Sequence, residues 1–228
     1  MSFYHSPKIV TDGLVLSLDA GNTKSYPGTG TLWSDRSGYT NNGTLTNGPT
    51  FSPANGGSIV FDGVDDYIIG NNSANFAFGT GDFAISYWMY VNAFSGTGTP
   101  TFVDLRTGAA GMGPAYSDYI QANKFKLYIN NTDAYTSAGS IVTGSWYNIV
   151  STRRSTTISV YFNGILDGTS SNNANLTENG FRLARNINAS GTSYLNGRMA
   201  SVLIYKGKAL SAQEVQQNFN ALRGRFGI

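Results

Sequence analysis

Short segments in which apolar residues alternate with polar or smaller ones recur from one end of this chain to the other. The clearest segment, residues 83–91, reads FAISYWMYV and has a large apolar residue at every second position. Successive side chains of a β-strand point to opposite faces, so this spacing predicts a strand with one face turned to a core. Further strands are expected at 14–18, 59–61, 67–69, 101–105, 124–129, 146–152, 157–162 and 199–205. Asn-Gly and Asp-Gly turn pairs lie between them, and the pattern therefore predicts an all-β sandwich of two antiparallel sheets.

One helix is expected near the carboxyl end of the chain. Ser211 and Glu214 stand three positions apart, which is the spacing of a capping box at the start of a helix. Val215, Phe219 and Leu222 then fall on one stripe at helical spacing. These residues predict a single short C-terminal α-helix that packs against the sandwich.

The composition limits the classes of partner. The 228 residues carry a net charge of +2 and no basic run longer than Arg153-Arg154, whereas a nucleic-acid-binding face needs clustered Lys and Arg. The absence of cysteine excludes disulfides and thiolate metal sites. No apolar run has the length of a membrane span, and the amino terminus lacks the pattern of a secretory signal. We expect no nucleic-acid partner, no membrane insertion, an N-terminal arm at residues 1–12 and one domain at residues 13–228.

The segment SIVFDGVDDYIIG, residues 58–70, places Asp62, Asp65 and Asp66 between two apolar runs. Only 13 of the 228 residues are acidic, so this group is a local excess. Hard cations such as Ca²⁺ bind several carboxylate and carbonyl oxygens, and Gly63 permits a sharp turn that brings such groups together. Asp and Gly are also ordinary turn formers. The segment therefore has two interpretations: a structural calcium ion, or a turn held by hydrogen bonds alone.

A set of aromatic residues falls out of phase with the main apolar positions of their strands, and it comprises Trp88, Tyr90, Tyr128, Tyr147 and Tyr161. If these strands are neighbours, the rings line one open face. Flat rings beside hydroxyl and amide groups suit a glycan. Tyr and Trp also favour strands and fill the second layer of a sandwich. The set is therefore either a glycan-binding surface or a packing and inter-subunit surface.

Motifs that cover nearly the whole chain resemble those of a known family. They are GLVLSLDAGN (13–22), LWSDRSGYTNNGTLTNGPTF (32–51), SIVFDGVDDYI (58–68), FAISYWMYV (83–91), WYNIVSTR (146–153), ISVYFNGILDG (158–168) and NGRMASVLIYKGKALSAQEV (196–215). In this order they resemble the laminin-G-like branch of the concanavalin A-like lectin/glucanase superfamily, which implies a jelly-roll sandwich. The resemblance also implies a structural Ca²⁺ near the acidic turn, with further acidic groups from a late G-x-I-D-E-V strand. Residues 197–202 read GRMASV here, so those carboxylates are missing.

The two ends of the chain resemble a narrower group. The lead-in PKIVTDGLVLSLDAGNTKSYPGTGT (7–31) and the finish QQNFNALRGRFGI (216–228) are similar to compact structural proteins of tailed phages. This resemblance implies a non-enzymatic virion component, either a capsid decoration or a head or tail fibre protein. For such a protein we expect assembly in the host cytoplasm, contacts with other virion proteins and a homo-oligomer. The alternative is a lectin-like carbohydrate-binding module that recognises host-surface glycans.

A glycoside hydrolase is the second alternative, and it needs two carboxyl groups that flank the scissile bond. Glucanase members of the superfamily carry them as glutamates in an E-x-D-x-x-E strand. This chain has only two glutamates, Glu178 and Glu214, and neither lies in such a strand. Asp65 and Asp66 are adjacent, so on an extended segment they point to opposite faces. His5, the one histidine, lies in the expected arm and leaves a serine-type site without its base. We therefore expect no enzymatic activity.

Overall fold

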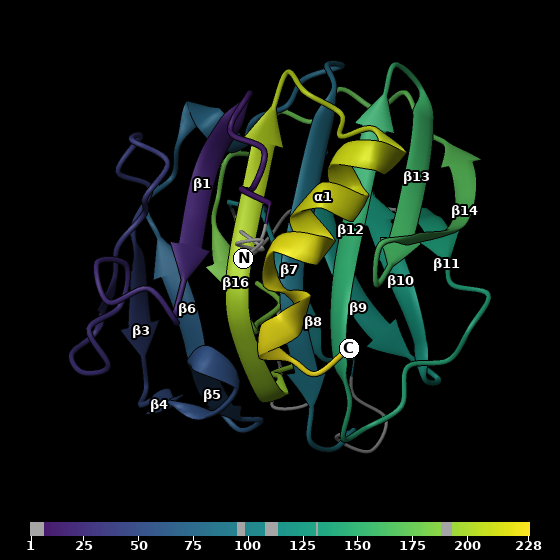
Figure 1. Ribbon diagram of the computed structural model, residues 1–228. Coiled ribbons are helices and arrows are strands. Elements are labelled where there is room, and N and C mark those ends of the chain that lie inside the picture. Colours follow the sequence, from purple (N-terminus) through teal and green to yellow (C-terminus); the bar gives the residue numbers. More distant parts are fainter. Residues whose placement is uncertain (1–6, 95–98, 108–113, 131, 188–192) are drawn as a thin grey trace, which may run out of the picture.

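The computed structural model describes residues 7–94, 99–107, 114–130, 132–187 and 193–228, which form two antiparallel sheets packed face to face (Figure 1). Sheet A has the order β14 (Ile165–Ser171), β13 (Thr157–Phe162), β12 (Trp146–Arg154), β7 (Phe83–Val91), β16 (Asn196–Lys206), β5 (Ser58–Asp62) and β4 (Thr50–Ser52), and β1 (Leu14–Asp19) also pairs with β16. Sheet B has the order β11 (Thr132–Thr136), β10 (Lys124–Ile129), β9 (Tyr116–Gln121), β8 (Thr101–Asp104), β15 (Arg182–Leu183), β6 (Tyr67–Gly70), β3 (Gly43–Thr46) and β2 (Leu32–Trp33). Short 3₁₀ turns lie at η1 (Ala54–Gly56), η2 (Ala74–Phe76) and η3 (Arg223–Arg225). The predicted sandwich is confirmed, and it is consistent with a concanavalin A-like jelly roll.

The hydrophobic core lies between the facing sides of the two sheets. Alternate side chains of β7, from Phe83 to Val91, point inward and are almost completely buried. Across the core, Tyr87 of β7 stacks on Phe102 of β8 with ring centroids 5.6 Å apart. Full burial of one large apolar side chain contributes roughly 1.5–3 kcal/mol. The alternation in the sequence therefore accounts for the face of β7 that is buried.

One buried cation, Arg153 of β12, closes an end of the core. Its guanidinium donates hydrogen bonds to the carbonyl oxygens of Gly79 (2.7 Å), Gly81 (2.7 Å) and Ala174 (2.8 Å). It also lies 5.0 Å from the centre of the Phe83 ring. Burial lowers the pKa of Arg153, so the guanidinium depends on these backbone partners for the hydration that it loses.

The helix α1 (Ala212–Leu222) crosses the outer face of sheet A (Figure 1). The predicted capping box is present, because the Ser211 hydroxyl accepts from the Glu214 N–H and the Glu214 carboxylate accepts from the Ser211 N–H. Phe219 of α1 stacks on Trp88 of β7 with centroids 5.6 Å apart, and Phe226 stacks on the same indole at 4.1 Å. The helix thereby forms a second, smaller apolar layer on this side of the sandwich.

Residues 7–12 of the expected N-terminal arm lie beside α1 and β16. The N–H of Val10 donates to the Asn218 side chain at 2.8 Å, and the Tyr205 hydroxyl donates to the Val10 carbonyl at 2.9 Å. Gln217 of α1 donates to the Lys8 carbonyl at 2.7 Å. Residues 1–6 of the arm, which include His5, lie outside the described residues.

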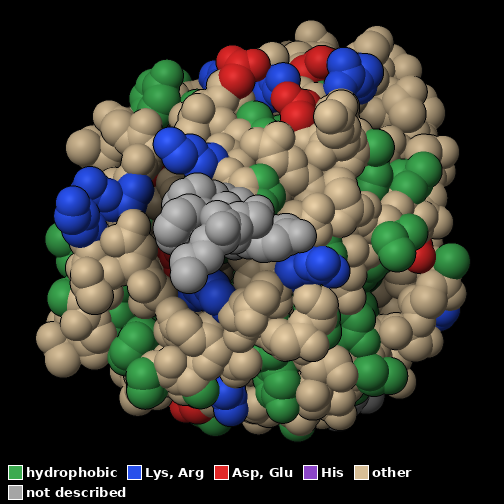
Figure 2. Space-filling model, in the orientation of Figure 1, with side chains coloured by type: hydrophobic (Ala, Val, Ile, Leu, Met, Phe, Trp, Pro, Cys, Tyr) green, Lys and Arg blue, Asp and Glu red, His purple; other side chains and the backbone are tan. Residues whose placement is uncertain are grey.

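Figure 2 shows the face of the molecule that carries α1. Hydrophobic side chains occur on this face in small separate groups, and the visible described atoms form no continuous apolar surface. Over the described residues, no helix is long and apolar enough to cross a membrane. The helix α1 lies on sheet A, and the described residues place no α-helix on the outer face of sheet B.

Candidate functional site

The five aromatic residues expected on one open face lie in three different environments. Trp88 is only 1% exposed because Phe219 and Phe226 cover it, and Tyr161 is buried beside the start of α1. Tyr90 is partly exposed and tilts against Trp146 at 5.5 Å. Tyr147 points to the opposite side of β12 and packs against the main core, whereas Tyr128 belongs to sheet B.

The five residues therefore do not form the shared face that the glycan-binding interpretation requires, and the packing interpretation describes Trp88. The helix α1 folds onto the face that carries Trp88, so this ring contributes to protein packing. The strand that carries Tyr128 pairs with β9 and β11 in the other sheet. Tyr128 is the one member of this set that belongs to the described lining of a pocket on the outer face of sheet B.

The acidic turn between β5 and β6 brings the three predicted carboxylates together. Oxygen atoms of Asp62, Asp65 and Asp66 all lie within 4.8 Å of one another. Asp66 is buried and accepts from the Asp62 N–H at 3.1 Å, and Asp62 accepts from the Val64 N–H at 2.8 Å. Burial raises the pKa of Asp66, the hydrogen bond from Asp62 opposes that shift, and the neighbouring carboxylates add to it.

This geometry accommodates both interpretations of the turn. Backbone hydrogen bonds to Asp62 and Asp66 are those of an acidic turn. The three carboxylates also supply part of the roughly six to eight oxygen ligands that Ca²⁺ takes. The strand opposite the turn contributes Asn196 and Arg198 in place of acidic residues, so the fit to a calcium ion is partial.

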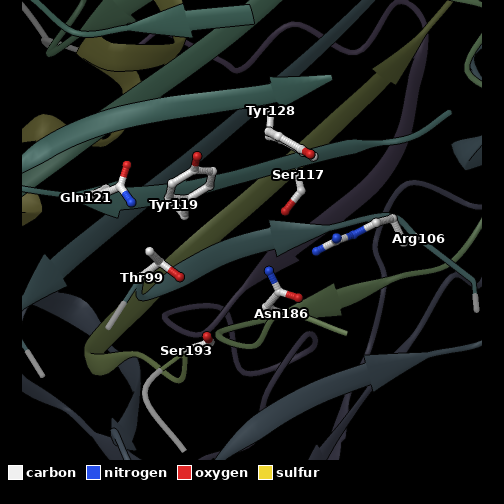
Figure 3. Close-up of a pocket in the computed structure, with 8 residues that line it drawn as sticks. All are labelled: Thr99, Arg106, Ser117, Tyr119, Gln121, Tyr128, Asn186 and Ser193. Carbon is white, nitrogen blue, oxygen red and sulfur yellow. The ribbon is translucent and has the colours of Figure 1, made fainter. Parts of the chain in front are cut away.

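An open pocket of about 280 Å³ lies on the outer face of sheet B (Figure 3). Its described lining consists of Thr99, Arg106, Ser117, Tyr119, Gln121, Tyr128, Asn186 and Ser193. The lining comes from β9, β10, the two ends of β8 and the segment that follows β15. Figure 3 shows these side chains arranged around a common space. The pocket thus combines rings, hydroxyls, amides and one guanidinium.

Two tyrosine rings form one side of the pocket. Tyr119 of β9 and Tyr128 of β10 meet edge to face with centroids 6.3 Å apart. The Tyr119 hydroxyl donates to Asp133 at 2.7 Å, and Lys126 holds the same carboxylate at 2.6 Å. Burial and the bond to Asp133 raise the pKa of Tyr119. The Tyr119 ring is therefore fixed as a neutral apolar surface with its hydroxyl turned to a partner outside the pocket.

The hydroxyl of Ser117 is the clearest indication that the pocket takes a ligand. Ser117 is 2% exposed, its Oγ has no hydrogen-bond partner among the described residues, and the residue lines the pocket. Figure 3 shows this oxygen directed into the space between the labelled residues. An unsatisfied buried hydroxyl costs about 1–3 kcal/mol, and a ligand that supplies the missing bond recovers that energy.

Arg106 adds a fixed cation to the pocket. Asp104, which is fully buried, accepts from Nε of Arg106 at 2.8 Å and from Nη2 at 2.7 Å. Asp104 also accepts from the Ile187 N–H at 2.7 Å. Such two-point pairs fix the plane of a guanidinium as well as its position. The Nη1 side of the Arg106 guanidinium, which does not contact Asp104, is therefore held in one orientation toward a ligand in the pocket.

Apart from Tyr128, the sequence interpretation missed the lining of this pocket. Ser117, Tyr119 and Gln121 occupy alternate positions of β9 and share its outward face. The inward position between Ser117 and Tyr119 holds Asp118 where an apolar residue is expected, so the strand lacks the usual alternation of apolar and polar residues. The β9–β10 turn is formed by Ala122 and Asn123, both with positive φ, and lacks the Asn-Gly or Asp-Gly signal. The periodicity of Ser117, Tyr119 and Gln121 was the signal that could have found the site.

Comparisons with known proteins agree with this architecture. The sequence pattern of the concanavalin A-like lectin/glucanases superfamily matches residues 62–216. No curated protein matches the chain. Among solved structures, the binding domain of Paraclostridial Mosquitocidal Protein 1 superposes with a TM-score of 0.71 at 17% identity, over 92% of this chain and 52% of that one.

Two further solved structures are similar. Domain 4 of AbnA, a GH43 extracellular arabinanase from Geobacillus stearothermophilus in complex with arabinotriose, gives a TM-score of 0.69 at 17% identity, over 90% of this chain and 97% of that domain. Trypanosoma rangeli sialidase in complex with 2,3-difluorosialic acid gives a TM-score of 0.71 at 17% identity, over 92% of this chain and 33% of the sialidase chain. The chain spans about half of the mosquitocidal fragment and a third of the sialidase. At these identities the likeness shows a shared fold.

Proposed function

Because the chain belongs to the concanavalin A-like lectin/glucanase superfamily, we propose that it is a non-enzymatic carbohydrate-binding module whose site is the pocket on the outer face of sheet B. The unpartnered hydroxyl of Ser117 is the observation that carries the proposal. A sugar hydroxyl is of the right size and polarity to bond it. The rings of Tyr119 and Tyr128 offer an apolar surface to the C–H groups of the same sugar.

The other groups of the pocket suit the same kind of ligand. The side-chain amides of Gln121 and Asn186 can each donate and accept, as neighbouring sugar hydroxyls require. The Arg106 guanidinium, held by Asp104, is an oriented donor. A volume of about 280 Å³ is close to the lower end of typical ligand pockets. In support of the same class, domain 4 of AbnA was solved with arabinotriose.

The absence of catalysis is part of the proposal, and the positions of the carboxylates support it. None of the eight described lining residues is acidic. Glu214 caps α1 and pairs with Lys208 at 2.7 Å, and Glu178 accepts from the Thr107 N–H at 2.8 Å. A pair of carboxyl groups that could flank a glycosidic bond is therefore missing from the described lining.

The test is calorimetric titration with a panel of oligosaccharides, followed by titration of variants. Ser117→Ala and Tyr128→Ala are each expected to lower the affinity for the glycan by about 5- to 30-fold, which corresponds to about 1–2 kcal/mol. Ser58→Ala is the matched control, because Ser58 is also a buried hydroxyl without a partner but lies on β5 of sheet A. Equal losses in all variants, or none, would contradict the assignment.

The wider setting that we propose is a phage particle, where the module would act as a capsid decoration or fibre component and contact other virion proteins. The lead-in and finish segments support this proposal, because they resemble those of tailed-phage structural proteins. They also lie together in the fold, since the Arg225 guanidinium of the finish donates to Asp19 of the lead-in at 2.8 Å. Mass spectrometry of purified particles tests the setting, and absence of the chain from them would contradict it.

A further inference from the structure

Three arginines lie close together on the outer face of sheet B, at the edge of the pocket. Arg106 follows β8, Arg182 begins β15, and Arg185 follows β15 directly before Asn186 of the lining. Arg182 stands opposite Asp104 in the β15–β8 pairing, and its Nη1 donates to the Arg106 carbonyl at 2.5 Å. Three guanidinium-bearing side chains therefore come from neighbouring segments at the edge of the pocket.

Acidic partners do not balance this cluster. Both oxygens of Asp104 are engaged by Arg106, as given above, and within the described chain Arg182 and Arg185 form no ion pair. The stretches that are not described contain neither Asp nor Glu. Among the described residues, Asp104 is therefore the one carboxylate that pairs with any of the three guanidinium groups.

Two further observations indicate that the excess charge faces a ligand. Arg185 lies over the Tyr67 ring at 4.5 Å and the Tyr194 ring at 5.6 Å, and its buried Nε has no hydrogen-bond partner within the described part of the chain. Burial lowers the pKa of Arg182, Asp104 opposes this shift, and the neighbouring Arg185 and Arg106 add to it. A negative group at this position would relieve the repulsion and supply the missing acceptor.

We infer that the glycan taken by the sheet B site is an acidic one, whose carboxylate or sulfate groups face Arg182 and Arg185 while a sugar ring occupies the pocket at Ser117. This inference rests on the proposed function. An acidic group would accept from two guanidinium groups that have no anionic partner of their own. Because Arg182 and Arg185 provide two cationic positions, we expect an oligosaccharide with repeated acid groups to bind more tightly than a single acidic sugar.

The experiment compares probes that differ only in charge. Oligogalacturonate is titrated beside its methyl ester, and a sulfated galactan beside its desulfated form, so that carboxylate and sulfate are distinguished. We expect an acidic probe to bind at least about tenfold more tightly than its neutral partner, and its affinity to fall from roughly 50 to 200 mM salt. A single-stranded oligonucleotide is included, and binding of it as tight as that of the glycan would overturn the inference.

Variants assign the effect to the cluster. Arg182→Gln and Arg185→Gln are expected to remove the preference for the acidic probe and to leave the neutral probe bound, whereas Arg182→Lys keeps the preference. Arg36→Gln is the control, because Arg36 is exposed and outside the described lining. Circular dichroism establishes that each variant is folded. Equal binding of acidic and neutral probes would overturn the acidic inference alone, and binding of neither would overturn the proposed function as well.

Discussion

The hydroxyl of Tyr87 donates a 2.9 Å hydrogen bond to the carboxylate of Asp118 across the core, and so links β7 of sheet A to β9 of sheet B. Tyr116 donates to the same carboxylate at 2.7 Å, and the Val103 N–H donates to its other oxygen at 2.9 Å. Asp118 is fully buried, and no cation pairs with it in the described chain. Burial raises its pKa to about 7, and these hydrogen bonds oppose the shift.

The raised pKa of Asp118 predicts a pH dependence of stability. The folded carboxyl holds its proton to about pH 7, whereas in the unfolded chain it releases the proton near the ordinary aspartate pKa of 3.8. The native state therefore binds more protons in this window, and the free energy of unfolding falls as the pH rises through it, by up to about 4 kcal/mol.

Urea titrations at pH values between about 4 and 7, with wild type and Asp118→Asn, measure this contribution. Carboxylates with lowered pKa, such as those of Asp133 and Glu214, make the free energy of unfolding rise with pH, and they do so in both proteins. The difference between the two proteins in the slope of unfolding free energy against pH therefore isolates Asp118. Identical slopes in the two proteins would show that Asp118 is already ionised in the folded state at low pH.

Arg153 is expected to be among the most sensitive positions of the core. Arg153→Met keeps much of the apolar stem but leaves the carbonyl oxygens of Gly81 and Ala174 without their donor, while that of Gly79 keeps only the Leu176 N–H. Each unsatisfied group costs about 1–3 kcal/mol, so the two carbonyls predict a loss of at least about 2 kcal/mol in urea unfolding.

Arg154→Met is the matched control for this measurement. Arg154 is the next residue of β12, is exposed, and donates one bond to the Ala209 carbonyl at 3.0 Å. We expect a loss of at most about 1 kcal/mol for this change. Similar losses at both positions would mean that the buried guanidinium has no special role.

The cover over Trp88 gives a spectroscopic prediction. Phe219→Ala removes a stacked ring from the indole and opens a cavity beneath α1, with an expected loss of about 3–5 kcal/mol. Because water then reaches Trp88, the tryptophan emission should shift to longer wavelength in the folded variant. Asn220→Ala on the same helix should leave the emission unchanged, and an unshifted spectrum in Phe219→Ala would contradict the packing.

The calcium interpretation of the acidic turn predicts a change in thermal stability. A ligand that binds only the folded state raises the melting temperature. On this interpretation millimolar Ca²⁺ raises it relative to excess chelator, and Asp65→Asn abolishes the difference, because Asp65 is an exposed member of the cluster. Equal melting temperatures with Ca²⁺ and chelator would leave the turn as a purely hydrogen-bonded feature.

The elements that local pattern determines were predictable. The alternation of β7 and the Ser211–Glu214 capping box depend on neighbours within a few residues, and both are present. Phase along a strand gives the side on which a residue lies, but it does not give the sheet to which the strand belongs. Tyr128 and Trp88 were therefore placed together although they lie on different sheets.

The pocket lining was hidden for a related reason. Asp118 reads as a polar surface residue, yet two tyrosine hydroxyls and a backbone N–H make it stable inside the core. This inward carboxylate obscured the strand that carries Ser117. The position of Arg106 depends on the pairing of β8 with β15, which are far apart in the sequence, so no local signal reports it.

The most direct test of the account is NMR chemical-shift mapping of the isotope-labelled chain during titration with the glycan that binds. The account predicts that the amide shifts of Ser117, Tyr119, Gln121 and Tyr128 change most and that those around Trp88 and α1 do not. Saturable changes confined to the α1 face, with the amides of β9 and β10 unmoved, would contradict it.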